Sequence, residues 1–157
     1  MNFDGWSLEV TEWRQLESVL HGAKWRSLPL DGLFRDSVPE SPGIYLLLTK
    51  RDGLGERYQI PEDLVNALYV GRSENLRRRF LEHASISRKN ILIDRCREVF
   101  GRLSFSYSMV PSDRQADYSG WIGDAESRLI SVLSPPANRS VPSRRPIAAR
   151  LGEPQPI

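Results

Sequence analysis

The segment from Leu103 to Met109 constrains the fold of this chain more than any other. Large side chains occupy every second position of this segment, and serines occupy the positions between them. This two-residue period predicts a β-strand, because successive side chains of a strand point to opposite faces of a sheet. The chain must therefore build a sheet around this segment.

Two other short apolar runs have the length of strands, and four longer segments have helical periodicity. The runs at 44–48 and 67–70 follow or precede glycine and proline, which is typical of strands. Helices are predicted over residues 8–21, 73–84, 88–100 and 118–133. Pro135 and Pro136 must end the last helix, since proline lacks the backbone donor. This order predicts an α+β domain with a small three-stranded sheet flanked by helices.

The composition limits the classes to which the protein can belong. A length of 157 residues suits one domain with short extensions. The longest uninterrupted apolar run, 44–48, is far below the roughly 18 residues that a membrane span needs, and the first residues do not resemble a secretion signal. The single cysteine, Cys96, excludes an internal disulfide and a cysteine-rich zinc site. We expect a cytoplasmic protein without membrane contact.

Basic residues are concentrated in the middle of the chain. Residues 72–102 hold nine arginines and lysines against four acidic residues. Clustered arginines suit phosphate binding, because they release condensed counterions and match phosphate oxygens with a planar fork of donors. A solvated basic helix has the same composition, so charge alone does not decide between the two interpretations.

Several polar residues occupy positions that face the core. Tyr45 and Tyr69 stand in the two apolar strands, where tyrosine is usually a packing residue. In the helix that follows, Arg79 and His83 share an arc with inward-facing apolar residues. Arg79 suits an ion pair or a phosphate contact. Arg72 lies near the predicted start of this helix, where backbone N–H groups favour a phosphate.

A carboxylate and an amide stand near the last predicted helix. Glu126 lies on the same helical stripe as Leu129 and Leu133. A carboxylate on an apolar stripe needs a cation, which is either an arginine or a magnesium ion that completes its shell with waters and phosphate oxygens. Asn138 follows the helix, where its amide is able to orient a neighbour or simply belongs to a turn.

The order and spacing of these residues resemble the GIY-YIG nuclease family. The resemblance spans residues 42–140 and includes Arg79, eight residues after Gly71. It departs from the family in a valine in the second motif, in a long step between the two tyrosines, and in Arg72 where repair nucleases of the family tend to carry lysine. The residues that carry the resemblance are Gly43, Ile44, Tyr45, Tyr69, Val70, Gly71, Arg79, His83, Glu126 and Asn138.

The resemblance implies a fold and a domain organisation. The fold is a three-stranded antiparallel sheet flanked by helices. Residues 41–140 form the nuclease domain, residues 1–40 a helical extension, and residues 141–157 a flexible tail that contains proline and arginine.

The resemblance also implies an activity, namely hydrolysis of DNA phosphodiester bonds with one divalent cation, Mg²⁺ or Mn²⁺, on Glu126. No small-molecule cofactor is expected, and the protein acts as a monomer or transient dimer. Tyr69 assists the attacking water, Arg79 clamps the phosphate and Asn138 fixes the geometry of the site. The expected catalytic residues are Tyr45, Tyr69, Arg72, Arg79, His83 and Asn138. The expected DNA-binding residues are Arg77, Arg78, Arg88 and Lys89.

Two other functions are compatible with the same sequence. One is a catalytically silent module that binds nucleic acid through its basic surface. The other is a protein-interaction domain within a larger complex. Glu126 argues against the silent module, because binding of DNA alone does not need a carboxylate at that position.

Overall fold

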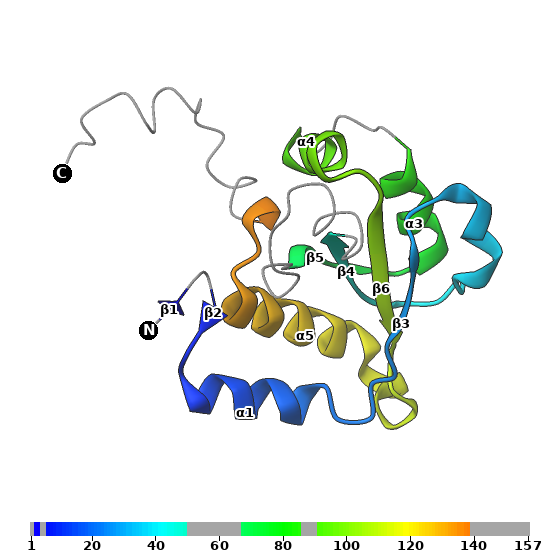
Figure 1. Cartoon of the computed structure of the whole chain (residues 1–157). Helices are drawn as coiled ribbons and strands as arrows, with labels where there is room; N and C mark the ends of the chain where they lie inside the picture. The colour runs from blue at the N-terminus through cyan, green and yellow to red at the C-terminus, as the bar shows by residue number, and fades with distance from the viewer. Residues whose placement is uncertain (1, 4–5, 50–66, 86–90, 139–157) are drawn as a thin grey trace.

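A four-stranded sheet lies at the centre of the structure, a computed structural model that describes residues 2–3, 6–49, 67–85 and 91–138. Its strands pair in the order β3-β6-β4-β5, and all neighbours run antiparallel (Figure 1). The strands of this sheet are β3 (Arg26–Pro29), β4 (Gly43–Thr49), β5 (Ala67–Ser73) and β6 (Leu103–Met109). A separate hairpin near the start of the chain pairs β1 (Asn2–Phe3) with β2 (Trp6–Ser7).

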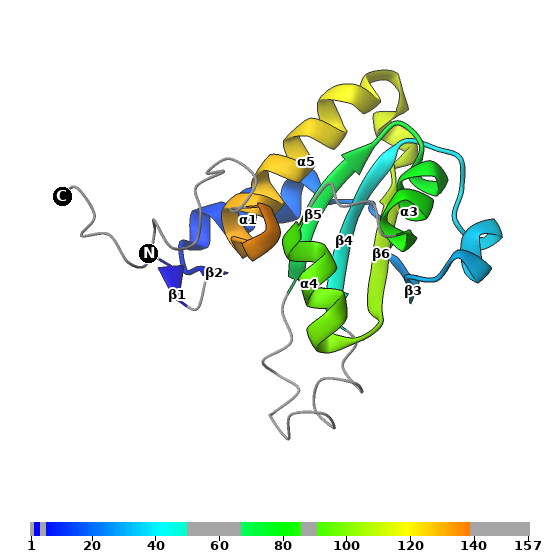
Figure 2. The same cartoon turned by 90° about the horizontal axis from the view of Figure 1, so that it is seen from above.

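Helices cover both faces of the sheet (Figure 2). On one face, α5 packs on the sheet with α1 beside it, and the indole of Trp121 joins the two helices by donating to the Val19 carbonyl at 2.8 Å. On the other face lie α3 and α4. The helices are α1 (Val10–Val19), α3 (Leu76–Ala84), α4 (Ile91–Phe100) and α5 (Tyr118–Leu133), with 3₁₀ turns η1 (Gly32–Ser37) and η3 (Ser112–Asp117). None of the described helices has the length and apolar character that crossing a membrane requires.

The predicted α+β class with an antiparallel sheet is confirmed, but the predicted number of strands is wrong. The sheet has a fourth strand, β3, which comes from the segment 1–40 and pairs with β6 at the edge of the sheet. This strand carries an arginine and ends in proline, so it lacks the apolar pattern of the other strands. Such residues are tolerated at a sheet edge, where one side of the backbone has no partner strand.

The alternating segment forms β6, yet both of its faces are covered. Its large residues Phe105 and Tyr107 lie in the core beneath α3 and α4. The intervening Ser106 and Ser108 are also buried, at 5% and 0% exposure. Ser106 pairs with Leu46 of the neighbouring strand β4, and the Leu46 side chain packs in the core beneath α5. Alternation therefore identified the strand, while small serines on its second face leave room for the helix layer above it.

The helix α3 begins three residues later than predicted. Ser73 still pairs with Gly43 in the sheet, and Asn75 caps the helix by accepting from the backbone N–H of Arg78 at 3.0 Å. The other N–H groups at this end are also paired, because those of Leu76 and Arg77 donate to the carbonyls of Ser41 at 2.9 Å and Pro39 at 3.1 Å. The expectation that this helix start offers free N–H groups to a phosphate is therefore wrong.

Other boundaries agree with the prediction more closely. The helix predicted at 118–133 has those bounds, and the one predicted at 8–21 is shorter by two residues at each end. The predicted connection between the first two strands lies largely in 50–66, outside the described residues, as does the tail 141–157.

Candidate active site

The candidate site contains two tyrosines from neighbouring strands. Tyr45 on β4 is 1% exposed, and Tyr69 on β5 is half-buried, with 6.0 Å between their ring centroids. Gly71 lies directly opposite Tyr45 in the register, and a Cβ atom at that position would overlap the Tyr45 hydroxyl. Glycine is thus required at position 71, because the Tyr45 ring lies across the neighbouring strand to reach the side of Tyr69.

His83 of α3 completes an aromatic cluster with the two tyrosines. Its Nε2 lies 2.9 Å from the Tyr45 hydroxyl, and its ring centroid lies 5.6 Å from that of Tyr69. Burial, and then the neighbouring Arg79 cation, lower the pKa of His83 to about 4. The imidazole is therefore neutral at physiological pH and acts as a hydrogen-bonding partner rather than as a charge.

The two phenols differ in how easily they ionise. Burial raises the pKa of Tyr69, whereas a hydrogen bond from Tyr45 and the charge of Arg79 lower it. Burial raises the pKa of Tyr45 well above its ordinary value, and the nearby Tyr69 raises it further. Tyr69 is consequently the first of the pair to lose its proton.

Arg79 supplies positive charge to this cluster from α3. Its Nη1 atom donates to Glu82 Oε2 at 2.8 Å. Its Nε atom is buried and has no hydrogen-bond partner within the part of the chain that the structure describes. A buried donor without a partner is costly, so the Nε–H of Arg79 is a group whose acceptor is missing among the described residues.

Glu126 reaches the site from α5 and lies next to Arg72. The Nε atom of Arg72 is 3.5 Å from Glu126 Oε1, and the two side chains are 54% and 23% exposed. Burial raises the pKa of Glu126, and Arg72 opposes this shift. The charge of Glu126 in turn raises the pKa of Tyr69 and of Tyr45, so the carboxylate lies within electrostatic range of both phenols.

Asn138 holds the strand that carries Tyr69. Its side-chain oxygen accepts from the Val70 N–H, and its side-chain nitrogen donates to the Val70 carbonyl, both at 2.8 Å. Val70 belongs to β5, the outer strand at this edge of the sheet. The amide therefore mimics a further strand at that residue and fixes the backbone next to Tyr69. This geometry makes Asn138 a positioning residue.

The donor set fits a magnesium or manganese ion better than zinc. Among the described residues no group of three or more His, Cys, Asp or Glu side chains is arranged to hold a metal. Zinc sites need three or four such ligands, whereas Mg²⁺ binds through one or two carboxylates and keeps several waters. Glu126 offers one partly exposed carboxylate, and its neighbour Arg72 is exposed. Glu126 is the residue that would hold the ion.

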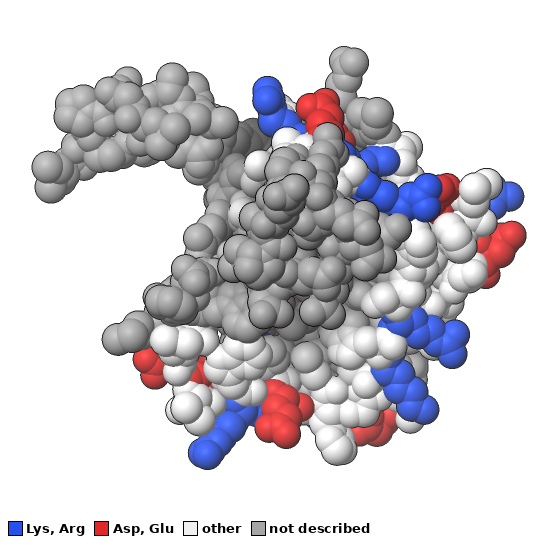
Figure 3. Space-filling model, viewed as in Figure 1, with Lys and Arg blue, Asp and Glu red and all other residues white. Residues whose placement is uncertain are grey.

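The residues expected to bind DNA occupy different environments. Arg78 is 63% exposed and reaches Glu82 only at 4.0 Å. Arg77 instead donates from Nε to the Val38 carbonyl at 2.8 Å, which ties α3 to the loop before β4. Arg88 and Lys89 lie outside the described residues. On the face seen in Figure 3, basic side chains alternate with acidic ones and do not form one continuous patch.

Two residues that support the site were not predicted. Glu82 pairs with Arg79 and Arg78 at spacings of three and four residues, a signal that was present in the sequence. Gly123 of α5 faces Arg72, and a Cβ atom there would lie 2.6 Å from the Arg72 Nη1 atom. A glycine inside a helix indicates close approach but not its partner, so sequence alone does not reveal this contact.

Comparisons of the chain with protein-family models, curated proteins and solved structures found no match. Its function must therefore be inferred from the geometry of these residues and from the motifs that resemble those of GIY-YIG nucleases. Of those residues, the structure brings Tyr45, Tyr69, His83, Arg79 and Glu126 into one electrostatically coupled group.

The low pKa of His83 predicts a pH dependence of folding stability. The folded-state pKa of about 4 lies below the ordinary value of 6.5, so the unfolded chain takes up this proton first as the pH falls. The stabilisation is thus complete above pH 6.5 and is lost between pH 6.5 and 4. Urea unfolding should show a loss of about 2 kcal/mol between pH 7 and pH 5 for the wild type.

The variant His83→Gln should lose much less stability over this range. The exposed His21 provides the matched control, and His21→Gln should behave as the wild type. Equal losses in the wild type and in His83→Gln would show that His83 is not buried in its neutral form.

Proposed function

We propose that this protein is a metal-dependent endonuclease that hydrolyses DNA phosphodiester bonds at one site similar to that of GIY-YIG nucleases. The observation that carries the proposal is the convergence of different chemical groups from separate elements. Two phenols, a carboxylate and a cation whose buried donor has no partner among the described residues influence one another electrostatically. Binding of DNA alone would need the cation but neither the phenols nor the carboxylate.

Tyr69 is the group that orients the attacking water and takes up its proton. This role requires the phenolate, which the Arg79 charge and the hydrogen bond from Tyr45 favour. Burial and the negative charge of Glu126 oppose the phenolate. A divalent cation on Glu126, when bound, neutralises that charge and polarises the phosphate oxygens. The neutral His83 holds the Tyr45 hydroxyl in place for Tyr69.

Arg79 stabilises the charge that develops on the phosphate. Glu82 occupies one edge of its guanidinium, and the buried Nε–H remains for a phosphate oxygen. Arg72 adds a second positive charge beside Glu126, and its exposed side chain is accessible to the substrate. Asn138 contributes by holding the β5 backbone at Val70 rather than by touching the reacting atoms.

A cleavage assay on supercoiled plasmid tests the proposal. In Mg²⁺ or Mn²⁺ the nicked form should appear before the linear form, because one set of catalytic residues attacks one strand at a time. Addition of EDTA should stop the reaction. DNA binding without cleavage would instead indicate a silent binding module. Absence of both binding and cleavage would favour a protein-interaction domain.

The two neighbouring arginines at the start of α3 should differ in their effect on DNA affinity. Arg78 is exposed, so Arg78→Ala should weaken binding to all sequences alike and reduce the slope of log affinity against log salt by about one. Arg77 is committed to the Val38 carbonyl, so Arg77→Ala should mainly lower the melting temperature. Fluorescence anisotropy at several salt concentrations measures the DNA affinity, and thermal unfolding measures the melting temperature. An equal change in salt slope for the two variants would contradict this assignment.

A further inference from the structure

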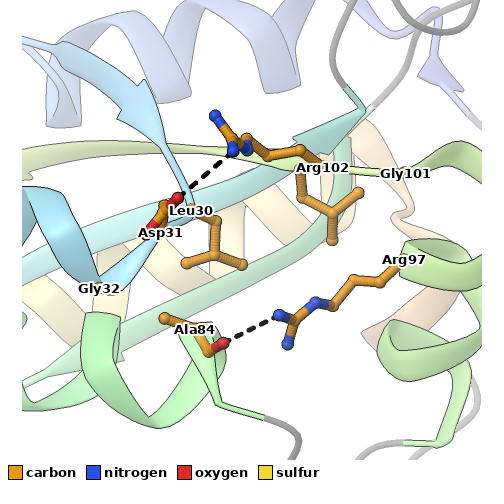
Figure 4. Close-up of a pocket in the computed structure, with 8 residues that line it drawn as sticks. Leu30, Asp31, Gly32, Ala84, Arg97, Gly101 and Arg102 are labelled. Carbon is orange, nitrogen blue, oxygen red and sulfur yellow. Dashed lines mark hydrogen bonds and ion pairs between the residues drawn. The ribbon is translucent and has the colours of Figure 1, made fainter.

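Arg97 of α4 lies beside a cavity next to the end of the helix that carries His83. The cavity has a volume of about 420 Å³ and contains none of the catalytic candidates. Figure 4 shows the Arg97 side chain extended across it toward Ala84, while Arg102 on the opposite side turns to Asp31. The residues that line it are Leu30, Asp31, Gly32, Ala84, Arg97, Gly101, Arg102 and Leu103.

The guanidinium of Arg97 binds three successive backbone carbonyls at the end of α3. Its Nη1 atom donates to the His83 carbonyl at 2.8 Å and to the Ser85 carbonyl at 3.3 Å. Its Nη2 atom donates to the Ala84 carbonyl at 2.8 Å. The last carbonyls of a helix have no partner within the helix, and a cation is favoured there. Arg97 therefore fixes the final turn of α3 from a neighbouring helix.

Through His83, Arg97 is connected to the aromatic cluster of Tyr45, Tyr69 and His83. The backbone of His83 is held by Arg97, and its imidazole lies 2.9 Å from the Tyr45 hydroxyl. Tyr45 in turn contacts Tyr69. A guanidinium presents several donors in a rigid plane, so it holds successive carbonyls in a way that a lysine ammonium does not reproduce. Arg102, the other arginine that lines the cavity, does not take this place, because it pairs with Asp31.

We propose that Arg97 is a positioning residue for His83, and through His83 for the Tyr45 hydroxyl. It touches no substrate in this role. It keeps the end of α3 at the distance from β4 that the hydrogen bond between His83 and Tyr45 requires. The effect on turnover rests on the proposed nuclease function, whereas the effect on His83 itself does not.

NMR titration of the histidines provides a readout that is independent of catalysis. The chain has two histidines, so the exposed His21 serves as a reference in each spectrum. The charged groups that act on His83 are Arg79, Glu82 and Arg97. In Arg97→Ala the His83 pKa should rise from about 4 toward its ordinary value, because a cation is lost and the imidazole gains access to water. Arg95→Ala, an exposed neighbour on the same helix, should leave it unchanged.

Kinetics test whether Arg97 acts through His83. Arg97→Ala should lower kcat roughly tenfold with little change in KM, as for other residues that orient a catalytic group. Arg97→Lys should recover part of the loss, and Arg97→Ala should have no further effect on kcat in a His83→Gln background.

Three results would overturn the proposal for Arg97. One is an unchanged His83 titration in Arg97→Ala. Another is a loss of kcat that only follows the folded fraction, and the third is additivity with His83→Gln. If the wild-type protein cleaves no DNA, the nuclease proposal fails, and the titration alone then decides whether Arg97 positions His83.

Discussion

Replacing Glu126 with glutamine is expected to lower DNA cleavage by several orders of magnitude while the protein remains folded. The substitution removes the carboxylate that would hold the divalent cation, and the ion would supply charge stabilisation at the phosphate. DNA binding should be unchanged or tighter, because a negative charge beside the phosphates disappears. Glutamine keeps the size of the side chain, so the helix packing around it is preserved.

Glu126→Gln should affect folding only slightly. Glu126 pairs with Arg72 at 3.5 Å, and more than half of the Arg72 side chain is exposed. Ion pairs that are open to solvent contribute about 1 kcal/mol or less to stability. A structural role of Glu126 therefore predicts a small fall in melting temperature with normal cleavage by the folded protein, which is a clearly different result.

Asp124 provides a matched control on the same helix. It pairs with Arg128 at 3.1 Å on the exposed side of α5, and Asp124→Asn removes the same charge there. Melting temperature, DNA affinity in Ca²⁺ and cleavage in Mg²⁺ should be measured for the wild type and both variants. Cleavage should collapse in Glu126→Gln and persist in Asp124→Asn. Normal cleavage by folded Glu126→Gln would remove the metal site from the proposal.

Local patterns in the sequence were sufficient to predict most helices and strands. The α5 helix has its predicted bounds, because apolar periodicity defines its body and Pro135 ends it. The edge strand β3 was missed, because its pairing with β6 is a long-range contact and its residues have weak strand character. Local propensity does not contain the information that another strand offers an unpaired edge.

The site shows the same division between local and long-range information. The helical spacing places Arg79 and His83 on one arc, and the structure brings both to Tyr45. The start of α3 was misjudged, because carbonyls of Pro39 and Ser41 from a preceding loop occupy its N–H groups. The contacts of Arg97 with the end of α3 also join residues of different helices. Motif spacing predicts such contacts only where a family pattern already includes them.

Replacing Arg79 with lysine should depress turnover far more than DNA affinity. Lysine keeps the positive charge but loses the buried Nε–H, which has no partner among the described residues and suits a phosphate oxygen in the transition state. Removal of one such preorganised donor costs on the order of 10² to 10³ in kcat. DNA affinity should change little, because the contact forms mainly as charge develops on the phosphate.

Arg78→Ala offers the matched comparison, since Arg78 and Arg79 are adjacent in α3 and both approach Glu82. Because Arg78 is exposed, Arg78→Ala should have the opposite effect, namely weaker DNA binding with a normal kcat at saturating DNA. Single-turnover cleavage with excess enzyme separates chemistry from binding for both variants. Wild-type rates for Arg79→Lys under these conditions would mean that charge alone suffices at position 79. The Nε–H, which has no partner among the described residues, would then serve no catalytic purpose, and position 79 would contribute only its positive charge.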